Sequence, residues 1–217
     1  YSFYVNYKIR IAFDYLNMNV NKIGIKESIE SPFILINSDW ETFFSGRSQR
    51  FRKSLRNKIN RANKSVGISI EKIQINDSNN PAIQDMFTVS EKSWKRQDGT
   101  DITSNPQSKN FHKEICDRFG PQGIISLWLL RKETIPIAFE FHLTYDNVVY
   151  PIRADYDESY KELSPGSVLE YNIIKTLFDE AKIREYNTCG HSYNYLMNWS
   201  EDTRKHANIE IFCKNYK

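Results

Sequence analysis

The segment that decides the fold of this chain reads Ser164-Pro165-Gly166-Ser167-Val168-Leu169, and it opens a long helical pattern. Pro165 and Gly166 interrupt the preceding strand and let the backbone approach a ligand, while Ser164 or Ser167 can cap the helix. The first turn of a helix carries unpaired N–H groups and the positive end of the macrodipole, so it can bind a pyrophosphate without a dedicated lysine. A helix cap without a ligand is the alternative interpretation.

The residues around this segment predict three antiparallel strands, then the helix, then a further strand. Strand patterns cover residues 124–130, 135–143 and 148–154, with polar turns at 131–134 and 145–147. From Val168 the apolar residues change to helical spacing, and residues 185–190 form another strand-like segment that ends at a glycine. This order indicates a mixed α/β fold with an antiparallel sheet.

A second helix with an unusual charge is expected between Gly46 and Val66. This stretch contains eight lysine and arginine residues and no acidic residue. Its apolar residues recur every three or four positions, which predicts an amphipathic helix with one buried stripe and a basic outer face. A solvated face is one interpretation of the charge, and a binding site for a polyanion is the other.

The length of 217 residues and the net charge of +3 are typical of one globular unit. Residues 31–217 are expected to form the main domain, and residues 1–30 an N-terminal extension or the remnant of a preceding half. The first residue is not methionine, so the sequence is expected to be a fragment of a longer chain.

The sequence also argues against several classes of protein. No apolar run reaches the length of a membrane-spanning helix, so membrane insertion is not expected. Three scattered cysteines predict reduced thiols and a cytoplasmic location rather than a disulfide framework. His112 and Cys116 lie four residues apart, but no second pair at ligand spacing accompanies them, so no metal is expected.

Four motifs give the chain a resemblance to a known family. In order they are residues 51–56 (FRKSLR), residues 135–139 (IPIAF), residues 164–169 (SPGSVL), and Gly190 with Tyr195 and Trp199. From about Ser31 onward, they resemble the GNAT acyltransferase superfamily, in particular its polysaccharide- and cellulose-biosynthesis branch related to the Fem aminoacyltransferases. That branch usually has lysine after the tyrosine, whereas Leu196 follows Tyr195 here; Arg204 or Lys205 is the expected replacement.

The resemblance implies a GNAT fold with helices on both faces of the sheet and a V-shaped opening between its central strands. It also implies acetyl-CoA or another acyl-CoA as co-substrate. The pantetheine arm would lie along residues 149–155, and a strand N–H would stabilise the thioester oxyanion. The residues predicted to bind the cofactor are Arg153, Lys161, Ser164, Pro165, Gly166, Ser167, Val168 and Leu169.

Candidate general bases lie on the two strands that flank this opening. By strand alternation Glu140 and His142 share one face, and Arg153 and Asp155 share a face of the next strand. A charged residue within an apolar strand needs a partner or a function, so Glu140 is either catalytic or paired with Arg153 across the strands. His142 is either a base or a core histidine. The predicted catalytic residues are Glu140, His142, Asp155 and Tyr195.

Candidate substrate-binding residues come from the basic helix, from the polar loop at residues 94–106, and from the aromatic residues after Gly190. The aromatic rings could stack on a sugar or belong to the core. The predicted substrate-binding residues are Arg52, Arg56, Trp94, Arg96, Tyr156, Tyr193 and Trp199.

The preferred function is N-acyl transfer from acyl-CoA to a small-molecule or glycan-linked amine, such as an amino sugar or a polysaccharide precursor. A Fem-type transferase that takes its acyl group from charged tRNA is the second hypothesis. A non-catalytic module that binds an anionic glycan is the third. Whether the chain forms a homodimer is left open.

Overall fold

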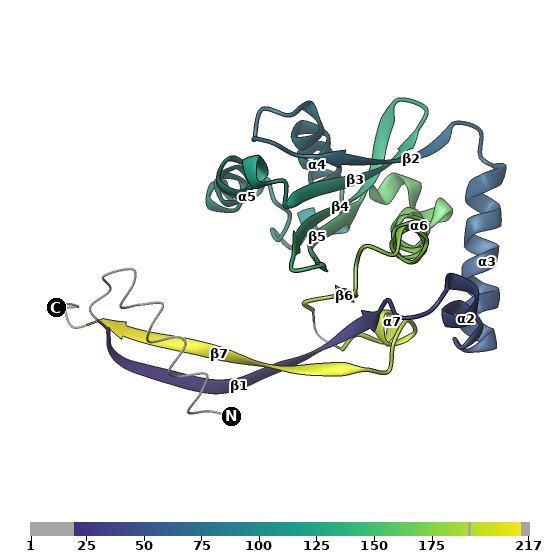
Figure 1. Cartoon of the computed structure of the whole chain (residues 1–217). Coiled ribbons are helices and arrows are strands. Elements are labelled where there is room, and N and C mark those ends of the chain that lie inside the picture. The colour runs from purple at the N-terminus through teal and green to yellow at the C-terminus, as the bar shows by residue number, and fades with distance from the viewer. Residues whose placement is uncertain (1–19, 191, 214–217) are drawn as a thin grey trace.

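The computed structural model describes residues 20–190 and 192–213 and contains a seven-stranded mixed sheet flanked by helices (Figure 1). The strand order is β2-β3-β4-β5-β6-β1-β7. All neighbouring strands are antiparallel except β5 and β6, which are parallel. The strands are β1 Val20–Leu35, β2 Ile68–Gln74, β3 Ile125–Lys132, β4 Ile135–Tyr145, β5 Val148–Tyr156, β6 Glu185–Asn187 and β7 Thr203–Cys213.

The three predicted antiparallel strands are β3, β4 and β5, and the backbone conformations of the turn residues account for the tight turns between them. Asp146 and Asn147 both have positive φ, at 49° and 57°, as a two-residue type I′ hairpin requires. Glu133, with φ 57°, reverses the chain between β3 and β4. These predictions are confirmed, and β6 lies where a further strand was expected.

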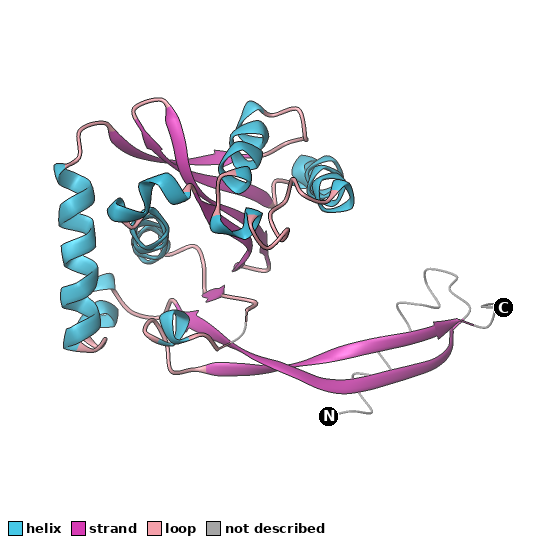
Figure 2. Cartoon of the chain, turned by 180° about the vertical axis from the view of Figure 1, so that it is seen from behind, coloured by secondary structure: helices cyan, strands magenta, loops and turns pink. Residues whose placement is uncertain are grey.

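Helices cover both faces of the sheet, as Figure 2 shows from behind. The apolar side chains of α2, α3 and α6 pack in one core cluster with Trp128, Leu130 and Ala138 of the sheet. Those of α4 and α5 pack in a second cluster with Leu127, Leu129, Phe139 and Phe141. The helices are α2 Trp40–Ser45, α3 Gln49–Lys64, α4 Pro81–Glu91, α5 Pro106–Phe119, α6 Pro165–Glu180 and α7 Asn194–Met197, with short 3-10 helices at η1 Trp94–Arg96, η2 Gly120–Gln122 and η3 Glu158–Leu163.

Alternation along the central strands sends neighbouring side chains to opposite cores. Residues 125–130 are all buried because both faces of β3 are covered by helices. On β4, Phe139 and Phe141 face α4 and α5, so Glu140 between them faces the side of α6. The mixed sheet with helices on both faces, as predicted, is confirmed.

The first and last described strands form a long antiparallel ribbon that extends away from the helical part of the molecule (Figures 1 and 2). β1 pairs with β7 from Val20 to Pro32, and only its end at Phe33–Leu35 pairs with β6. The predicted boundary after residue 30 falls within β1, and that division of the chain stays a prediction. Residues 1–19 lie outside the described part.

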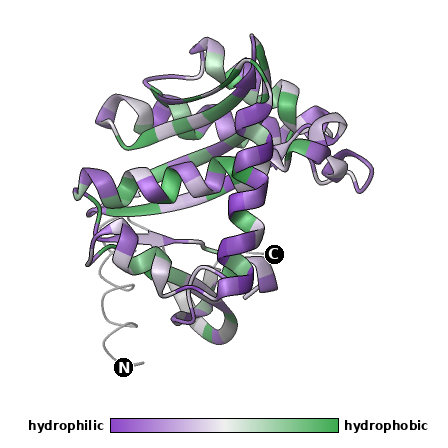
Figure 3. Cartoon of the chain, turned by 90° about the vertical axis from the view of Figure 1, so that its right-hand side faces the viewer, coloured by the Kyte–Doolittle hydropathy of each residue, from purple (hydrophilic) through white to green (hydrophobic). Residues whose placement is uncertain are grey.

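The predicted basic helix is α3, which faces the viewer in Figure 3 and is coloured mostly as hydrophilic. Its buried stripe contains Leu55 and Ala62, and Phe51 and Ile59 pack partly against the same core. Among the described residues, no helix combines the length and the apolar character needed to cross a bilayer.

Candidate active site

The central opening of the sheet lies between β5 and β6. These parallel strands pair only at Val148 with Glu185 and at Val149 with Tyr186. Beyond Val149 the edge of β5 that faces β6 has no partner strand, and a cleft of about 360 Å³ opens there. Its lining comes from η1, β4, β5, α6, β6 and α7, and includes Trp94, Lys95, Glu140, Asp155, Tyr156, Gly166, Ser167, Leu169, Glu170, Tyr186, Thr188 and Tyr195.

One end of the cleft is the N-terminal turn of α6. Ser164 precedes this helix with φ 52°, and its side chain makes no capping hydrogen bond. A Cβ atom on Gly166 would meet only Tyr156 Cδ1, at 3.6 Å, so the helix start is open to the cleft. The N–H groups of this turn can therefore bind an anionic ligand.

Basic helix α3 adds charge beside this turn. Lys58 donates a hydrogen bond from Nζ to Ser167 Oγ at 2.9 Å, and Arg61 donates from Nη1 to the carbonyl oxygen of Glu162 at 2.8 Å. Two cations of α3 thus lie close to the start of α6, where the helix dipole already favours an anion.

The wall formed by β5 carries an irregularity where the cleft opens. Phe141 pairs with Arg153, but His142 pairs with Pro151, so Ile152 is an extra residue in β5. Such a bulge bends a strand and frees backbone groups from the ladder. Because Pro151 has no N–H, the N–H groups that β5 can offer to the cleft lie after it.

The floor of the cleft contains the carboxyl group of Glu140, which is only 5% exposed. His142 Nε2 lies 2.9 Å from Glu140 Oε2, and the Tyr186 hydroxyl donates to the same oxygen at 3.0 Å. His142 is 1% exposed and lies behind Glu140, so it orients this carboxyl group and does not reach the cleft itself.

A second carboxyl group, Glu170 on α6, faces the same space. The indole N–H of Trp199 donates to Glu170 Oε2 at 2.9 Å. Burial and, next, repulsion by Glu140 raise the pKa of Glu170 to about 8, although Trp199 and Lys58 act in the opposite direction. Near neutral pH Glu170 therefore holds a proton that it can release and take up.

Two tyrosines complete the wall opposite β5. Burial and, next, the charge of Glu140 raise the pKa of Tyr186 well above its usual value. Burial and, next, the charge of Glu170 raise the pKa of Tyr195, whose ring stacks on Tyr193 with 5.9 Å between centroids. Both hydroxyl groups are therefore protonated at neutral pH, and Tyr195 can act as a proton donor.

The cross-strand ion pair between Glu140 and Arg153, one of the two alternatives for Glu140, does not form. Arg153 Nε instead lies 2.9 Å from Asp155 Oδ2, and Lys95 Nζ contacts the other carboxylate oxygen. Ser90 Oγ donates a third hydrogen bond, at 2.7 Å. Asp155 borders the cleft with both carboxylate oxygens bound by cations, and Arg153, which also donates to the carbonyl oxygen of Thr100 at 3.0 Å, does not line the cleft.

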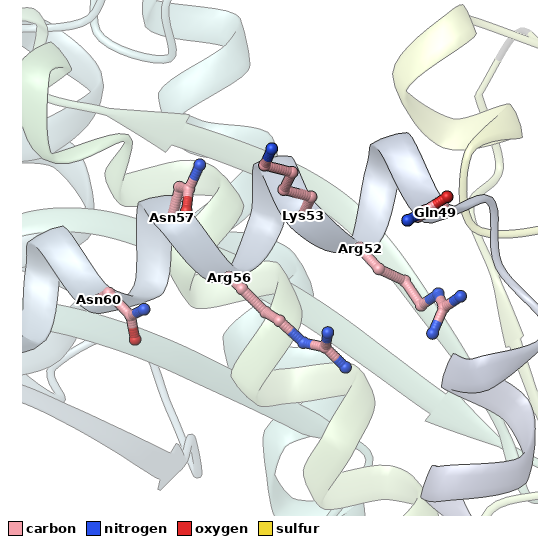
Figure 4. A pocket seen from close by; sticks show the side chains of 6 residues that line it. All are labelled: Gln49, Arg52, Lys53, Arg56, Asn57 and Asn60. Atoms are coloured by element: carbon pink, nitrogen blue, oxygen red, sulfur yellow. The ribbon is translucent and has the colours of Figure 1, made fainter.

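Several predicted substrate residues lie outside the cleft. Figure 4 shows Arg52 and Arg56 extending from α3 over a separate, open hollow of about 430 Å³. Arg96 is bound within its own loop, by Thr103 and Ser104 at 3.1 and 3.2 Å. Of the predicted substrate residues, Trp94 and Tyr156 line the cleft.

The predicted cofactor residues divide in the same way. Gly166, Ser167 and Leu169 line the cleft, whereas Val168 is buried in the core behind them. Lys161 is paired with Glu158 at 3.6 Å on the exposed side of η3. The binding roles predicted for these residues stay predictions.

The aromatic residues near the C-terminus differ in burial: Trp199 is buried, whereas Tyr193 and Tyr195 are exposed. Trp199 is 2% exposed, so it is a core residue that orients Glu170 and is not a platform for a sugar.

The two residues expected to replace the missing lysine do not line the cleft. Arg204 forms a bidentate pair with Glu185 at 2.6 and 2.9 Å, and Lys205 lies on the ribbon strand β7.

Sequence reasoning missed Glu170, Lys58 and Tyr186. Glu170 follows Gly166 by four residues and so lies on the same helical face, which is a signal that was available. The contacts of Lys58 and Tyr186 depend on long-range packing of α3 on α6 and of β6 on β4. Among residues 20–190 and 192–213, no three His, Cys, Asp or Glu side chains are grouped as metal ligands.

Comparison with known proteins gives the family. Residues 49–196, well over half of the chain, match the family model described as "Acetyltransferase (GNAT) domain". A search of curated proteins found no match.

Solved structures agree on the fold. The C-terminal domain of a putative lysylphosphatidylglycerol synthetase from Agrobacterium fabrum is 15% identical, with a TM-score of 0.58 over 87% of this chain and 61% of its own. L-PGS from Bacillus licheniformis is 12% identical, with a TM-score of 0.58 and coverages of 95% and 65%. FemX is 11% identical, with a TM-score of 0.57 and coverages of 89% and 64%.

At these identities the structural likeness concerns the fold alone, and the chain spans just under two thirds of the length of these three relatives. The family match covers the strands and helices that build the cleft. The chain belongs to the GNAT acyltransferase family.

Proposed function

We propose that this protein transfers an acyl group, most simply acetyl, from acyl-CoA to the amine of an amino sugar or a polysaccharide precursor. The observation that carries the proposal is the cleft between β5 and β6. It runs from an open helix start at Gly166 and Ser167 to the buried carboxyl group of Glu140. An anion site and a site for proton transfer therefore share one cavity.

The helix start fits the diphosphate group of coenzyme A. Pro165 has no N–H and Val168 donates to the carbonyl oxygen of Ser164, which leaves the N–H groups of Gly166 and Ser167 for the ligand. Gly166 leaves room for close approach, and Lys58 supplies a positive charge at Ser167. The unpaired edge of β5 beyond Val149 would then hold the extended pantetheine arm by backbone hydrogen bonds.

Acyl-CoA supplies an activated carbonyl carbon, which bonds to the acceptor nitrogen as the carbon–sulfur bond breaks and sulfur leaves as a thiolate. The β5 N–H groups after Pro151 stabilise the negative charge on the carbonyl oxygen. In this proposal the hydroxyl of Tyr195, which lines the cleft, gives its proton to the thiolate. The acylated nitrogen then gives a proton back to Tyr195.

Aromatic side chains at the mouth of the cleft favour a sugar as the carrier of the amine. Trp94 is 47% exposed and Tyr195 59% exposed, and both line the cleft. Exposed aromatic faces suit the apolar faces of sugar rings. An acyl-CoA donor also agrees with the expected cytoplasmic location.

The proposal is tested by titrating the protein with acetyl-CoA in a calorimeter, beside Gly166→Glu, which places a carboxylate at the helix start. We expect binding by the natural chain and loss of binding in Gly166→Glu. Gly46→Glu is the matched control, because Gly46 is exposed and a Cβ atom there meets only a carbonyl oxygen at 3.4 Å and a second at 3.8 Å. No binding by the natural chain would overturn the proposal.

A tRNA-dependent aminoacyl transfer is the second candidate, and the outer face of α3 favours it. Arg52, Lys53 and Arg56 lie on one side of this helix beside three amide side chains, without a carboxylate in the stretch (Figure 4). Such a surface suits a phosphate backbone. Transfer of an amino acid from charged tRNA that ribonuclease abolishes would select this candidate. Ligand binding that weakens with salt, without turnover, would instead indicate a non-catalytic module.

A further inference from the structure

The outer face of α3 carries a strongly basic surface that lies outside the cleft. The hollow of about 430 Å³ on this face is lined by side chains of α3 alone (Figure 4). Residues three and four apart on a helix are neighbours, so cations and carboxamides follow one another along about 16 Å of the helix. We call these residues the α3 stripe: Gln49, Arg52, Lys53, Arg56, Asn57 and Asn60.

The cations of this stripe are available to a ligand. Within the described residues, no ion pair involves a lysine or arginine of α3. Arg52 Nε donates to the carbonyl oxygen of Arg47 at 3.0 Å, and the guanidinium carbon of Arg56 lies 5.7 Å from the centre of the Phe44 ring. These contacts orient the two side chains but supply no negative charge, so an anionic partner would be the first to do so.

The carboxamides narrow the kind of anion that fits. Gln49, Asn57 and Asn60 each offer N–H donors and a carbonyl acceptor, as the hydroxyl groups of sugars require of their partners. An arginine side chain can hold a carboxylate by two parallel hydrogen bonds. The stripe therefore has partners for a polymer that carries both hydroxyl groups and negative charges.

Two other anionic partners fit this surface less well. The exposed residues of α3 are all polar or charged. A helix that lies on a membrane needs apolar side chains toward the lipid, and recognition of single-stranded RNA uses exposed aromatic rings. Duplex RNA, which is bound through its phosphates, is the alternative that an experiment has to separate.

We propose that the α3 stripe is a binding site for an acidic polysaccharide, separate from the cleft between β5 and β6. The anionic groups of the polymer pair with Arg52, Lys53 and Arg56, and its hydroxyl groups pair with the carboxamides. Lys58 extends from another side of α3 to Ser167, so occupation of the stripe should leave acetyl-CoA binding unchanged. The proposal concerns binding and not turnover, and so goes beyond the proposed function.

Calorimetric titration of the whole chain tests the proposal with polygalacturonate, with neutral dextran, with polyglutamate and with an RNA duplex. We expect polygalacturonate to bind most tightly, and to bind more weakly as salt rises from about 50 to 200 mM. The double variant Lys53→Gln/Arg56→Gln should weaken this binding about tenfold at low salt. The matched control is Lys113→Gln/Arg118→Gln, which removes the same charges from exposed positions of α5.

A second pair of substitutions separates recognition of sugar from attraction by charge. Asn57→Ala/Asn60→Ala keeps every charge and the helix but removes two carboxamides. It should weaken the binding of polygalacturonate and leave that of polyglutamate unchanged. Lys53→Glu, a single change at an exposed position, should also weaken polygalacturonate binding and provides a test that does not depend on the folding of a double variant.

Each contrary result overturns a stated part of the proposal. Equal affinity of the α3 and α5 double variants for polygalacturonate would overturn the site. Polyglutamate binding as tight as that of polygalacturonate would overturn the recognition of a sugar polymer. Tighter binding of duplex RNA that the α3 substitutions weaken would replace the polysaccharide by RNA. Acetyl-CoA titrated beside these polymers reports on the proposed function separately.

Discussion

Acidic side chains on opposite faces of the sheet have different surroundings: Asp155 of β5 lies on one face, and Glu140 of β4 with Glu170 of α6 lies on the other. On the α4 side, Asp155 is bound by Lys95, Arg153 and Ser90. On the α6 side, Glu140 and Glu170 face a cleft and lack a lysine or arginine partner within the described residues. Asp155 and Glu140 are buried and Glu170 is partly buried, but within the described residues only Asp155 has lysine or arginine partners.

The difference separates a structural site from a functional one. A buried charge with its partners in place stabilises the local geometry, here the anchoring of the loop around Trp94 and Thr100 to β5. On the α6 side, Glu170 instead lowers the total charge by holding a proton near neutral pH, and a cation that enters would favour its ionised form. The arrangement on the α6 side therefore suits a ligand of positive charge.

Removing the neutralised acid should give the largest effect on stability. Asp155→Ala leaves Lys95 and Arg153 mostly buried without their counter-charge, so the free energy of unfolding should fall by about 3 to 5 kcal/mol. Denaturant titration measures this change, with the exposed Asp98→Ala as control. Equal midpoints for Asp155→Ala and the natural chain would contradict the structural role of this cluster.

Removing the charge of the un-neutralised acid should affect catalysis instead. Glu140→Gln keeps a hydrogen-bond acceptor for Tyr186 but removes the carboxyl group from the proposed site for proton transfer, so kcat/KM should fall about 100-fold. Thiol-release kinetics measure it, and Glu114→Gln on the exposed side of α5 is the control. A greater loss of stability than in Asp155→Ala, with activity intact, would reverse the comparison.

Local sequence signals predicted the turns, the helix start and the residues that share a strand face, but not the surroundings of each acid. The turn at Asp146 and Asn147 and the helix start at Pro165 follow from residue chemistry, and strand alternation correctly placed Glu140 with His142 and Arg153 with Asp155. Alternation could not tell which face each pair takes, because both faces of β4 and β5 are covered by helices.

The features that were not predicted depend on contacts between distant segments. Glu170 reaches the cleft because β6 separates from β5 after two residue pairs, a property of the sheet and not of α6. Lys58 reaches Ser167 across 109 residues of sequence. Trp199 belongs to the core for the same reason, since its partner Glu170 lies 29 residues earlier.

The pH dependence of stability should differ between the two acid groups. Glu170 has a raised pKa of about 8 in the folded state against an ordinary value of 4.5, so the folded state retains a proton that the unfolded state has lost. The contribution of Glu170 to the free energy of unfolding is therefore fully present below pH 4.5, and it is lost as the pH rises toward 8.

Glu170→Gln should remove this part of the pH dependence, and thermal unfolding between pH 5 and pH 8 would measure it. The charged and titratable groups that face Glu170 are Glu140 on β4, Lys58 on α3, Tyr186 on β6 and Tyr195 on α7. The tyrosines stay protonated in this range, so the part of the slope that Glu170→Gln removes belongs to Glu170. An identical slope in Glu170→Gln would show that another group titrates.

The smallest effect is expected from Lys58, whose charge favours the ionised form of Glu170 and which also donates to Ser167. Lys58→Met should raise the pKa of Glu170 further, so thermal unfolding should show the fall in stability extending to higher pH by less than about one unit. It should also weaken acetyl-CoA binding, because the helix start loses a cation. Lys53→Met on the outer face of the same helix is the control. An equal shift in Lys53→Met would mean that the overall charge of α3, and not the contact at Ser167, sets the proton affinity of the cleft.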